Sequence, residues 1–192
     1  MTFYESVEQL PPFRDYSMAN RTYRYFREEP LYPFGYGLSY TTFRYEHARA
    51  DSPEGDADGN ILVSARVTNA GSVAGEEVVQ VYVTHPDVEG APIHALAGFT
   101  RISLAPGASQ TVRFSLHERD LSIVDAEGIR RIIPRPVKAW IGGGQPAQAT
   151  GNRQQATATG EATGHRPQAT GKEITPGVET EFTMTRKAVL PE

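Results

Sequence analysis

Adjacent carboxylates are the first residues of this sequence that could do chemistry. Glu76 and Glu77 are neighbours, and a pair of carboxyl groups facing one substrate can supply a nucleophile and a general acid. The residues around them alternate between apolar and polar types, which predicts a β-strand. Because neighbouring side chains on a strand point to opposite faces, we predict that this pair does not form a catalytic site.

Two further patterns have the side chains that a metal ion needs. The acidic segment 56–60 resembles the start of a calcium loop, but Ile61 stands where that pattern requires glycine, so a polar hairpin turn is favoured. His85 and His94 have no further ligands at a suitable spacing, and we interpret them as loop histidines. The sequence therefore predicts no metal ion and no cofactor.

Composition narrows the classes of protein and partner. The 192 residues are 39% hydrophobic and 22% charged, which suits one domain with extensions, and cysteine is absent. The net charge is −4, and basic residues cluster only at Arg21, Arg24 and Arg27, so neither nucleic acid nor an anionic membrane is an expected partner. No apolar run approaches the roughly 18 residues of a membrane span, and residues 1–6 lack the features of a signal peptide.

Alternating strands must position any site in this chain. Short alternating runs are separated by turn residues such as Pro106 and Gly107, and no amphipathic helix lies between them. This pattern predicts an all-β fold, an antiparallel β-sandwich. Trp140 is interpreted as a core residue between the sheets, and a sugar-stacking ring is the alternative. The predicted strands are 42–48, 61–68, 77–84, 96–104, 110–116, 137–142 and 180–185.

An aromatic segment precedes the first strand. Five rings lie between Leu31 and Phe43, and Gly35 and Gly37 make a helix improbable there. We name residues 1–37 the strap. Its rings would leave much apolar surface in contact with water, so the strap is expected to lie on a partner surface.

A second segment interrupts the alternating pattern. Residues 145–177 repeat Ala-Thr-Gly and contain no large apolar cluster. Burial there cannot offset the backbone entropy of ordering, about 1 to 2 kcal/mol per residue, so we predict a disordered insertion. Residues 178–192 are then expected to form a final strand and a tail, and residues 38–144 the body of the sandwich.

Several motifs resemble those of a known family. The segments 10–13, 21–26 and 30–40 are similar to the link out of the α/β catalytic domain in glycoside hydrolase family 3, the β-glucosidases and β-xylosidases. The segments 67–82 and 96–107 resemble the fibronectin type III-like domain that closes many of these enzymes, a sandwich of the immunoglobulin type. Together the resemblance covers residues 1–144 and 178–192, and it implies that the strap is a remnant of the preceding domain.

The resemblance also implies what this chain does. The parent enzyme would hydrolyse terminal β-D-glucosyl or β-D-xylosyl residues, with a nucleophilic aspartate and an acid/base carboxylate upstream of the matched segments. Retaining hydrolysis needs two carboxyl groups roughly 5 to 5.5 Å apart, so the chain alone is expected to be inactive. The parent would be periplasmic or secreted, while this sequence by itself leaves the compartment open.

The expected role is to stabilise the catalytic domains of the same parent enzyme, which are the expected partner. The alternative is an autonomous carbohydrate-binding or adhesion module whose partner is a polysaccharide. Under the first hypothesis the docking residues belong to the strap. They are Arg21, Tyr23, Arg24, Tyr25, Phe26, Tyr32, Phe34 and Tyr36.

Overall fold

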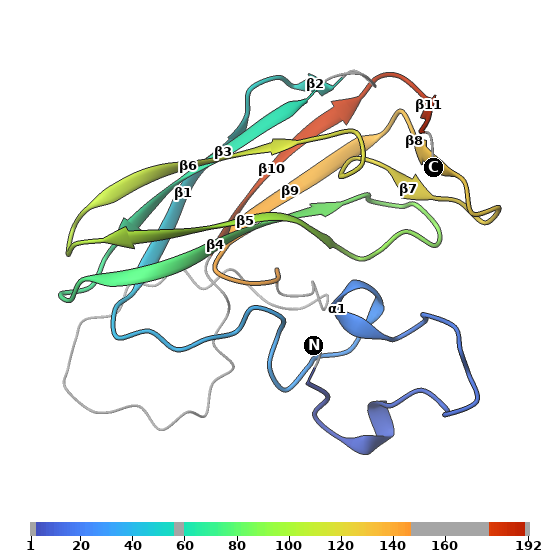
Figure 1. Cartoon of the computed structure of the whole chain (residues 1–192), viewed down its shortest axis with the longest axis horizontal. Coiled ribbons are helices and arrows are strands. Elements are labelled where there is room, and N and C mark those ends of the chain that lie inside the picture. Colours follow the sequence, from blue (N-terminus) through green and yellow to red (C-terminus); the bar gives the residue numbers. More distant parts are fainter. Residues whose placement is uncertain (1–2, 56–59, 147–176, 191–192) are drawn as a thin grey trace.

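The computed structural model describes residues 3–55, 60–146 and 177–190. In this part of the chain the fold is nearly all β, with one short 3-10 helix and one helical turn, both in the strap (Figure 1). The elements are η1 (Val7–Gln9), α1 (Thr22–Tyr25), β1 (Phe43–Ala50), β2 (Glu54–Gly55), β3 (Ile61–Asn69), β4 (Gly75–Thr84), β5 (Ala95–Leu104), β6 (Ser109–Leu116), β7 (Ile123–Val124), β8 (Arg130–Ile132), β9 (Pro136–Gly142), β10 (Gly177–Met184) and β11 (Ala188–Val189).

The strands form two main sheets that pack face to face. One sheet has the order β1-β3-β6, and the other has the order β2-β10-β9-β4-β5. All of their pairings are antiparallel except the short parallel pair of β10 and β2. A small sheet of order β11-β8-β7 lies at one end. The predicted antiparallel β-sandwich is confirmed.

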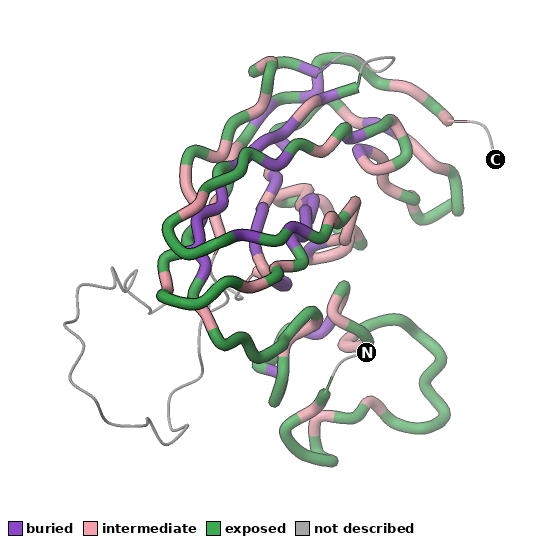
Figure 2. The backbone as a smooth tube through the Cα atoms, turned by 60° about the vertical axis from the view of Figure 1, so that its left-hand side comes forward, coloured by how far each residue is buried: buried purple, intermediate pink, exposed green. Residues whose placement is uncertain are grey.

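Alternating side chains of the two sheets form the core. Val79, Val81 and Val83 of β4 point inward and are almost fully buried, opposite Val63 and Val67 of β3. Figure 2 shows this buried interior running along the strands of the sandwich, while most of the strap is exposed. The core therefore follows the period of two that the sequence shows.

The longer strands lie where the alternation predicts them, within a few residues at each end. Phe182 and Met184 of β10 both point into the core, at 2% and 1% exposure, as predicted for the final strand. The short strands β2, β7, β8 and β11 were not predicted, because two or three residues are too few to show a period. The predicted turn at 56–60 falls largely on residues 56–59, which lie outside the described residues. Of the predicted insertion, 145–177, residues 147–176 also lie outside them, but its ends are ordered, because Gln145 is buried and Gly177 is the first residue of β10.

Trp140 is the exception to the predicted core. It alternates with the buried residues Ala139 and Ile141, so its ring lies on the outer face of the five-stranded sheet and is half-buried. There its indole N–H donates to the backbone carbonyl of Gly144 at 3.3 Å. The prediction that Trp140 lies between the sheets was wrong, because the strand register places the neighbouring small residue inside.

Asn69 fixes the point where the strap joins the sandwich. Its side chain is fully buried, and its amide donates to the backbone carbonyls of Val73 at 2.8 Å and Leu104 at 2.9 Å. Its carbonyl oxygen accepts from the Thr41 hydroxyl at 2.5 Å and from the Gly71 N–H at 3.1 Å. One satisfied amide thus holds Thr41, a few residues after the strap, against two turns of the sandwich.

Candidate functional site

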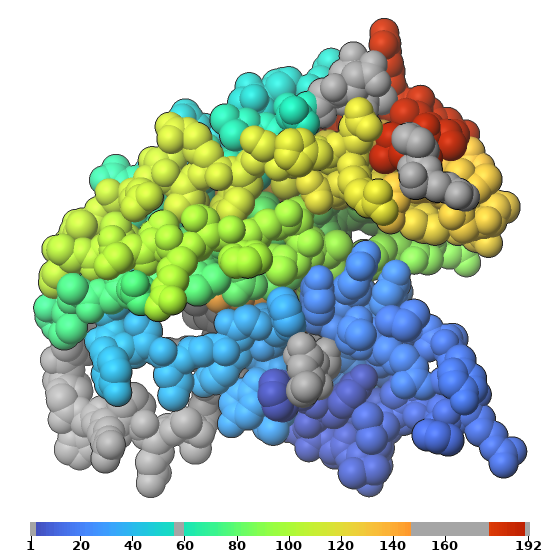
Figure 3. Space-filling view, viewed as in Figure 1, coloured from blue at the N-terminus to red at the C-terminus, as the bar shows by residue number. Residues whose placement is uncertain are grey.

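The strap lies along one side of the sandwich. In Figure 1 it runs below β4 and β5, and Figure 3 shows its side chains against those of the sandwich. Its contacts fall on the outer face of the five-stranded sheet, which carries Gln80, Tyr82 and Trp140. The candidate site has two surfaces, one that joins the strap to this sheet and one that the strap presents outward.

Tyr23 is the centre of the inner surface. Its ring stacks on Phe34 with centroids 4.6 Å apart and lies 5.9 Å from the ring of His94. It also meets Tyr82 of β4 edge to face at 6.0 Å, and Tyr82 meets His94 in the same way at 5.7 Å. We name these four residues the aromatic anchor. Such ring pairs add about 0.5 to 1.5 kcal/mol each beyond the burial of their area.

Backbone hydrogen bonds add to the aromatic anchor. The N–H of Phe34 donates to the side-chain oxygen of Gln145 at 2.8 Å, and the N–H of Gln145 donates to the carbonyl of Phe34 at 3.0 Å. The N–H of Ile93 donates to the carbonyl of Arg24 at 2.7 Å. These bonds join the strap to the segments that follow β4 and β9.

The strap and sheet approach so closely that a side chain is excluded at Gly35. This glycine has φ +84°, and a Cβ atom there would lie 2.6 Å from Nε2 of Gln80. Gln80 is itself buried, accepts from the hydroxyl of Tyr82 at 2.5 Å and donates to the carbonyl of Gly143 at 3.3 Å. Its position is therefore set by both neighbours, and it cannot move away from a larger residue at 35 without losing these bonds.

Other strap residues pack within the strap itself. Phe26 is buried at 1% exposure, and Tyr4 meets its ring edge to face at 4.9 Å. The guanidinium group of Arg21 donates to the carbonyls of Ser17, at 2.9 Å, and Asp15. The strap therefore has a small interior of its own.

The outward surface of the strap is apolar and exposed. Tyr32 contacts the rings of Phe3 and Tyr36, with centroids 6.0 and 4.9 Å away, yet all three residues are between 41% and 50% exposed. We name these three residues the exposed ring cluster. Further exposed apolar side chains of the strap and of the three residues after it are Val7, Leu10, Phe13, Tyr16, Met18, Leu31, Leu38 and Tyr40.

The predicted docking residues thus fall into two groups. Arg24, Tyr32 and Tyr36 are exposed and face solvent in this chain. The other five, of which Phe26 is buried and the rest half-buried, are Arg21, Tyr23, Tyr25, Phe26 and Phe34.

Residues of the sheet that receive the strap were missed by the sequence analysis. Gln80 and Tyr82 occupy outward positions of β4 and are nonetheless buried, at 6% and 0% exposure. The inward row of β4 is all valine, and its other face carries Gln80 and Tyr82. The large ring of Tyr82 on that outer face was the available signal that something covers it. His94 and Gln145 lie in connecting segments, where the sequence contains no comparable signal.

Burial sets the protonation of two histidines, of which His94 contacts Tyr23 of the strap. His94 is 3% exposed, and among the described residues Nε2 of His94 and Nδ1 of His85 are buried without a hydrogen-bond partner. Burial lowers the pKa of each imidazole to about 4, because the charged form loses its hydration. Both histidines lie in the predicted loop, and both are neutral at pH 7.

The adjacent carboxylates face opposite ways, as predicted. Glu76 is exposed and forms an ion pair with Arg101. Glu77 points inward and lies beside Tyr45 and Gly143, where burial raises the pKa of its carboxyl group. In the described ranges, no cluster of three acidic, histidine or cysteine residues could hold a metal ion, and no helix could span a membrane. Glu76 and Glu77 therefore do not form a facing carboxylate pair.

Comparisons with known proteins agree with this arrangement. A family model described as a fibronectin type III-like domain matches residues 77–145. A xylan 1,4-β-xylosidase of Xylanibacter ruminicola is 40% identical over 127 residues, which cover 66% of this chain and 14% of that protein. A periplasmic β-glucosidase of Salmonella typhimurium is 39% identical over 131 residues, covering 60% of this chain and 17% of that protein.

Solved structures give the same result. A β-glucosidase of Erythrobacter marinus matches 96% of this chain with a TM-score of 0.65 and 29% sequence identity. A β-glucosidase of Kluyveromyces marxianus matches 87% with a TM-score of 0.63 and 26% identity. This chain covers only 21% and 17% of those two chains. The chain therefore contains a fibronectin type III-like domain and matches the C-terminal part of family 3 glycoside hydrolases, as its sequence motifs predict.

Proposed function

We infer that this chain is a non-catalytic module that docks on the catalytic domains of a family 3 glycoside hydrolase and stabilises their arrangement. The parent activity would be hydrolysis of terminal β-D-glucosyl or β-D-xylosyl residues, as the names of the relatives suggest. The relatives are several times longer than this chain, so the domains that would be stabilised lie in the part of each relative that the chain does not match. The division into strap (1–37), sandwich, insertion and final strand with tail is part of this proposal, with the bounds of the insertion drawn in from 145–177 to 147–176 because Gln145 pairs with Phe34 and Gly177 begins β10.

The observation that carries the proposal is the two-sided strap. Its inner side is fixed to the sandwich by the aromatic anchor, while its outer side presents the exposed ring cluster. Burying apolar surface stabilises a complex by about 25 cal/mol per Å², so a partner that covers these rings would gain affinity from each of them. Arg24 of the strap is also exposed, and a guanidinium group can pair with a carboxylate of the partner.

The test is to mix the 192-residue chain with a separately expressed catalytic part of a matching β-xylosidase or β-glucosidase. We expect a complex by analytical ultracentrifugation and a higher Tm of the catalytic part. The double substitution Tyr32→Ser with Tyr36→Ser should weaken the complex at least tenfold.

Phe99→Ser is the matched control. Phe99 is 69% exposed on β5, so its substitution removes an exposed ring of the sandwich and leaves the strap intact. Equal loss of binding in both variants, or no complex with the unmodified chain, would refute docking through the strap.

A module that binds sugars through a row of rings is the second hypothesis, and the structure does not favour it. Among the described residues beyond position 40, Phe99 is the one exposed phenylalanine, tyrosine or tryptophan. A single ring gives no flat row on which successive sugar units could stack. Hydrolysis by the chain itself is tested with an aryl β-glucoside and an aryl β-xyloside, for which we expect no turnover above buffer.

A further inference from the structure

The outer face of the β1-β3-β6 sheet carries a group of arginines. This face lies on the side of the sandwich opposite to the strap, because the strap covers the outer face of the other sheet. Strand register places Arg49 of β1 and Arg113 of β6 on either side of Ser64 of β3. The next row of the same face places Arg66 between Glu46 and Thr111.

Three of these arginines have no acidic partner among the described residues. The ion pairs recorded there join Arg44 to Glu46 and three pairs elsewhere in the fold, and none includes Arg49, Arg66 or Arg113. Asp51 is nearby, but one of its carboxylate oxygens accepts from the backbone N–H of Leu62 at 3.0 Å. This sheet face therefore holds three exposed guanidinium groups that form no ion pair with a described residue, although the carboxylate of Asp51 lies in the same hollow as Arg49 and Arg113 and Glu46 lies opposite Arg66.

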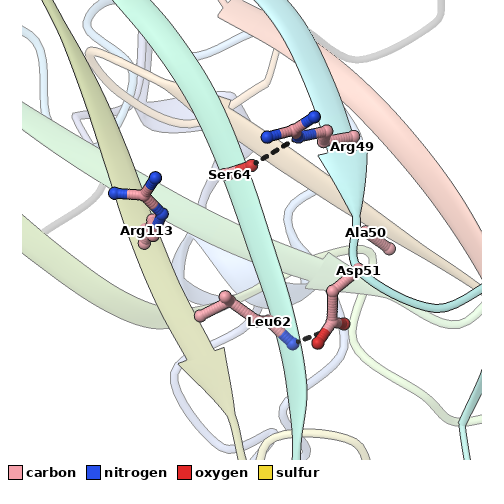
Figure 4. Close-up of a pocket in the computed structure, with 6 residues that line it drawn as sticks. All are labelled: Arg49, Ala50, Asp51, Leu62, Ser64 and Arg113. Carbon is pink, nitrogen blue, oxygen red and sulfur yellow. Dashed lines mark hydrogen bonds between the residues drawn. The ribbon is translucent and has the colours of Figure 1, made fainter.

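The arginines line two adjoining hollows. One of about 200 Å³ is lined by Arg49, Asp51, Leu62, Ser64 and Arg113, with Ala50 at its edge, and Figure 4 shows the two guanidinium groups on either side of the Ser64 hydroxyl. Arg49 donates to that hydroxyl from Nε at 3.4 Å. The second hollow, about 480 Å³, shares Arg49 and Ser64 with the first. Its further lining residues are His47, Ala48, Ala65, Arg66 and Thr111.

We propose that this face binds an acidic polysaccharide, with a uronate carboxylate between Arg49 and Arg113 and neighbouring sugar hydroxyls in the hollow beside Arg66 and Thr111. A guanidinium group can bind a carboxylate through two parallel hydrogen bonds, and two such groups flank the Ser64 hydroxyl. Sugar hydroxyls both donate and accept, which suits the Thr111 hydroxyl and the His47 imidazole at the second hollow.

The choice of a glycan rests on the proposed function, and the charge of the face supports it over other polyanions. Arg49 and Arg113 on either side of Ser64 suit one isolated carboxylate, whereas nucleic acid presents a continuous row of phosphates and needs an extended basic surface. The residues lining the two hollows include no phenylalanine, tyrosine or tryptophan, and the imidazole of His47 is the one ring among them, so the face has no series of rings on which successive bases could stack. An anionic substituent on an otherwise neutral polysaccharide would present one carboxylate to Arg49 and Arg113 and hydroxyl groups to the second hollow.

The test is affinity electrophoresis of the full 192-residue chain at about 0.15 M salt, where weak surface electrostatics are screened. The gels contain glucuronoxylan, or the same glucuronoxylan after chemical reduction of its carboxyl groups. We expect the native polymer to retard the chain. After carboxyl reduction, the apparent Kd obtained from the retardation should be at least tenfold higher. Arg49→Gln and Arg113→Gln should each weaken binding of the native polymer about tenfold, while Arg14→Gln, an exposed strap residue with the same change of charge, should not.

Three outcomes would overturn the proposal: no retardation, equal retardation by native and reduced polymer, or equal loss in the Arg14→Gln control. Equal binding to duplex DNA or to anionic lipid vesicles would also overturn it, because it would show unselective attraction of anions. The substitutions lie at exposed positions, and far-UV circular dichroism verifies that each variant is folded. The arginines lie on the face opposite to the strap, and the assay contains no catalytic domain. Failure of docking and failure of glycan binding therefore give separate results.

Discussion

Phe34 and Gln145 exchange two hydrogen bonds across 111 residues of sequence, from the strap to the segment after β9. The N–H of Phe34 donates to the Gln145 side chain at 2.8 Å, and the N–H of Gln145 donates back to the carbonyl of Phe34 at 3.0 Å. Gln145 is 4% exposed, so water does not replace its side chain in this bond. This reciprocal pair makes the strap a part of the folded domain.

Gln145→Ala should loosen the strap. The substitution leaves the N–H of Phe34 without its acceptor, which costs about 1 to 3 kcal/mol for a buried group. We expect faster hydrogen exchange at residues 23–36 and slow exchange retained in β3 and β4. Gln110→Ala, at an exposed position of β6, is the control and should leave exchange in the strap unchanged. Unchanged exchange in both variants would show that the pair does not hold the strap.

Gly35→Ala should displace the strap from the sheet. The new Cβ atom would lie 2.6 Å from Nε2 of Gln80 at a residue with φ +84°, and left-handed backbone at a residue other than glycine costs about 1 to 3 kcal/mol. We expect a lower urea midpoint and a greater exposure of Tyr23 in tyrosine fluorescence quenching. Gly37→Ala is the matched control, because a Cβ atom there meets nothing within 4 Å. Equal midpoints for the two variants would contradict this packing.

His94 should make the fold sensitive to acid. Its pKa is lowered to about 4 by burial, below the ordinary value of 6.5, so the unfolded chain binds the proton at a higher pH than the folded chain. The contribution of neutral His94 to the free energy of unfolding is therefore fully present above pH 6.5. It falls by about 3 kcal/mol as the pH drops from 6.5 toward 4. His94→Phe should reduce this fall in urea unfolding, whereas exposed His117→Phe should not. Burial lowers the pKa of His85 to about 4 as well, so His85 contributes to the fall in the same direction.

Glu77 has the opposite pH dependence. Burial raises the pKa of its carboxyl group above the ordinary value of 4.5, so the folded chain holds the proton more tightly than the unfolded chain. The stability from this residue is complete below pH 4.5 and is lost as the pH rises through the raised pKa. Glu77→Gln should therefore raise the Tm at pH 7 and have no effect at pH 4. Exposed Glu127, changed to Gln, serves as the control. A lower Tm at pH 7 would show that the charged carboxylate is stabilising.

The sandwich could be predicted because its signal is local. Val79, Val81 and Val83 alternate with Val78, Gln80 and Tyr82, and this period of two is enough to place a strand and its buried face. The turn at Gly107, with φ +74°, likewise follows from the residue types at that turn. Glu76 and Glu77 could be separated by the same argument.

The site could be predicted only in part. The strap was found from its rings, yet which ring faces inward was not predicted, since Tyr23 and Tyr25 look alike in sequence. Trp140 was placed on the wrong face, because its neighbours Ala139 and Ile141 are also apolar and either register buries an apolar row.

By itself the sequence determined the fold class, the strands of the core and the existence of an aromatic segment that needs cover, because each depends on residues close together in the chain. The tertiary structure alone decided that Tyr23 meets His94 and Tyr82, that Gln145 pairs with Phe34, and that Arg49 and Arg113 flank Ser64. These contacts join strands and loops far apart in sequence. They depend on strand order and register, and no local pattern of residue types encodes either one.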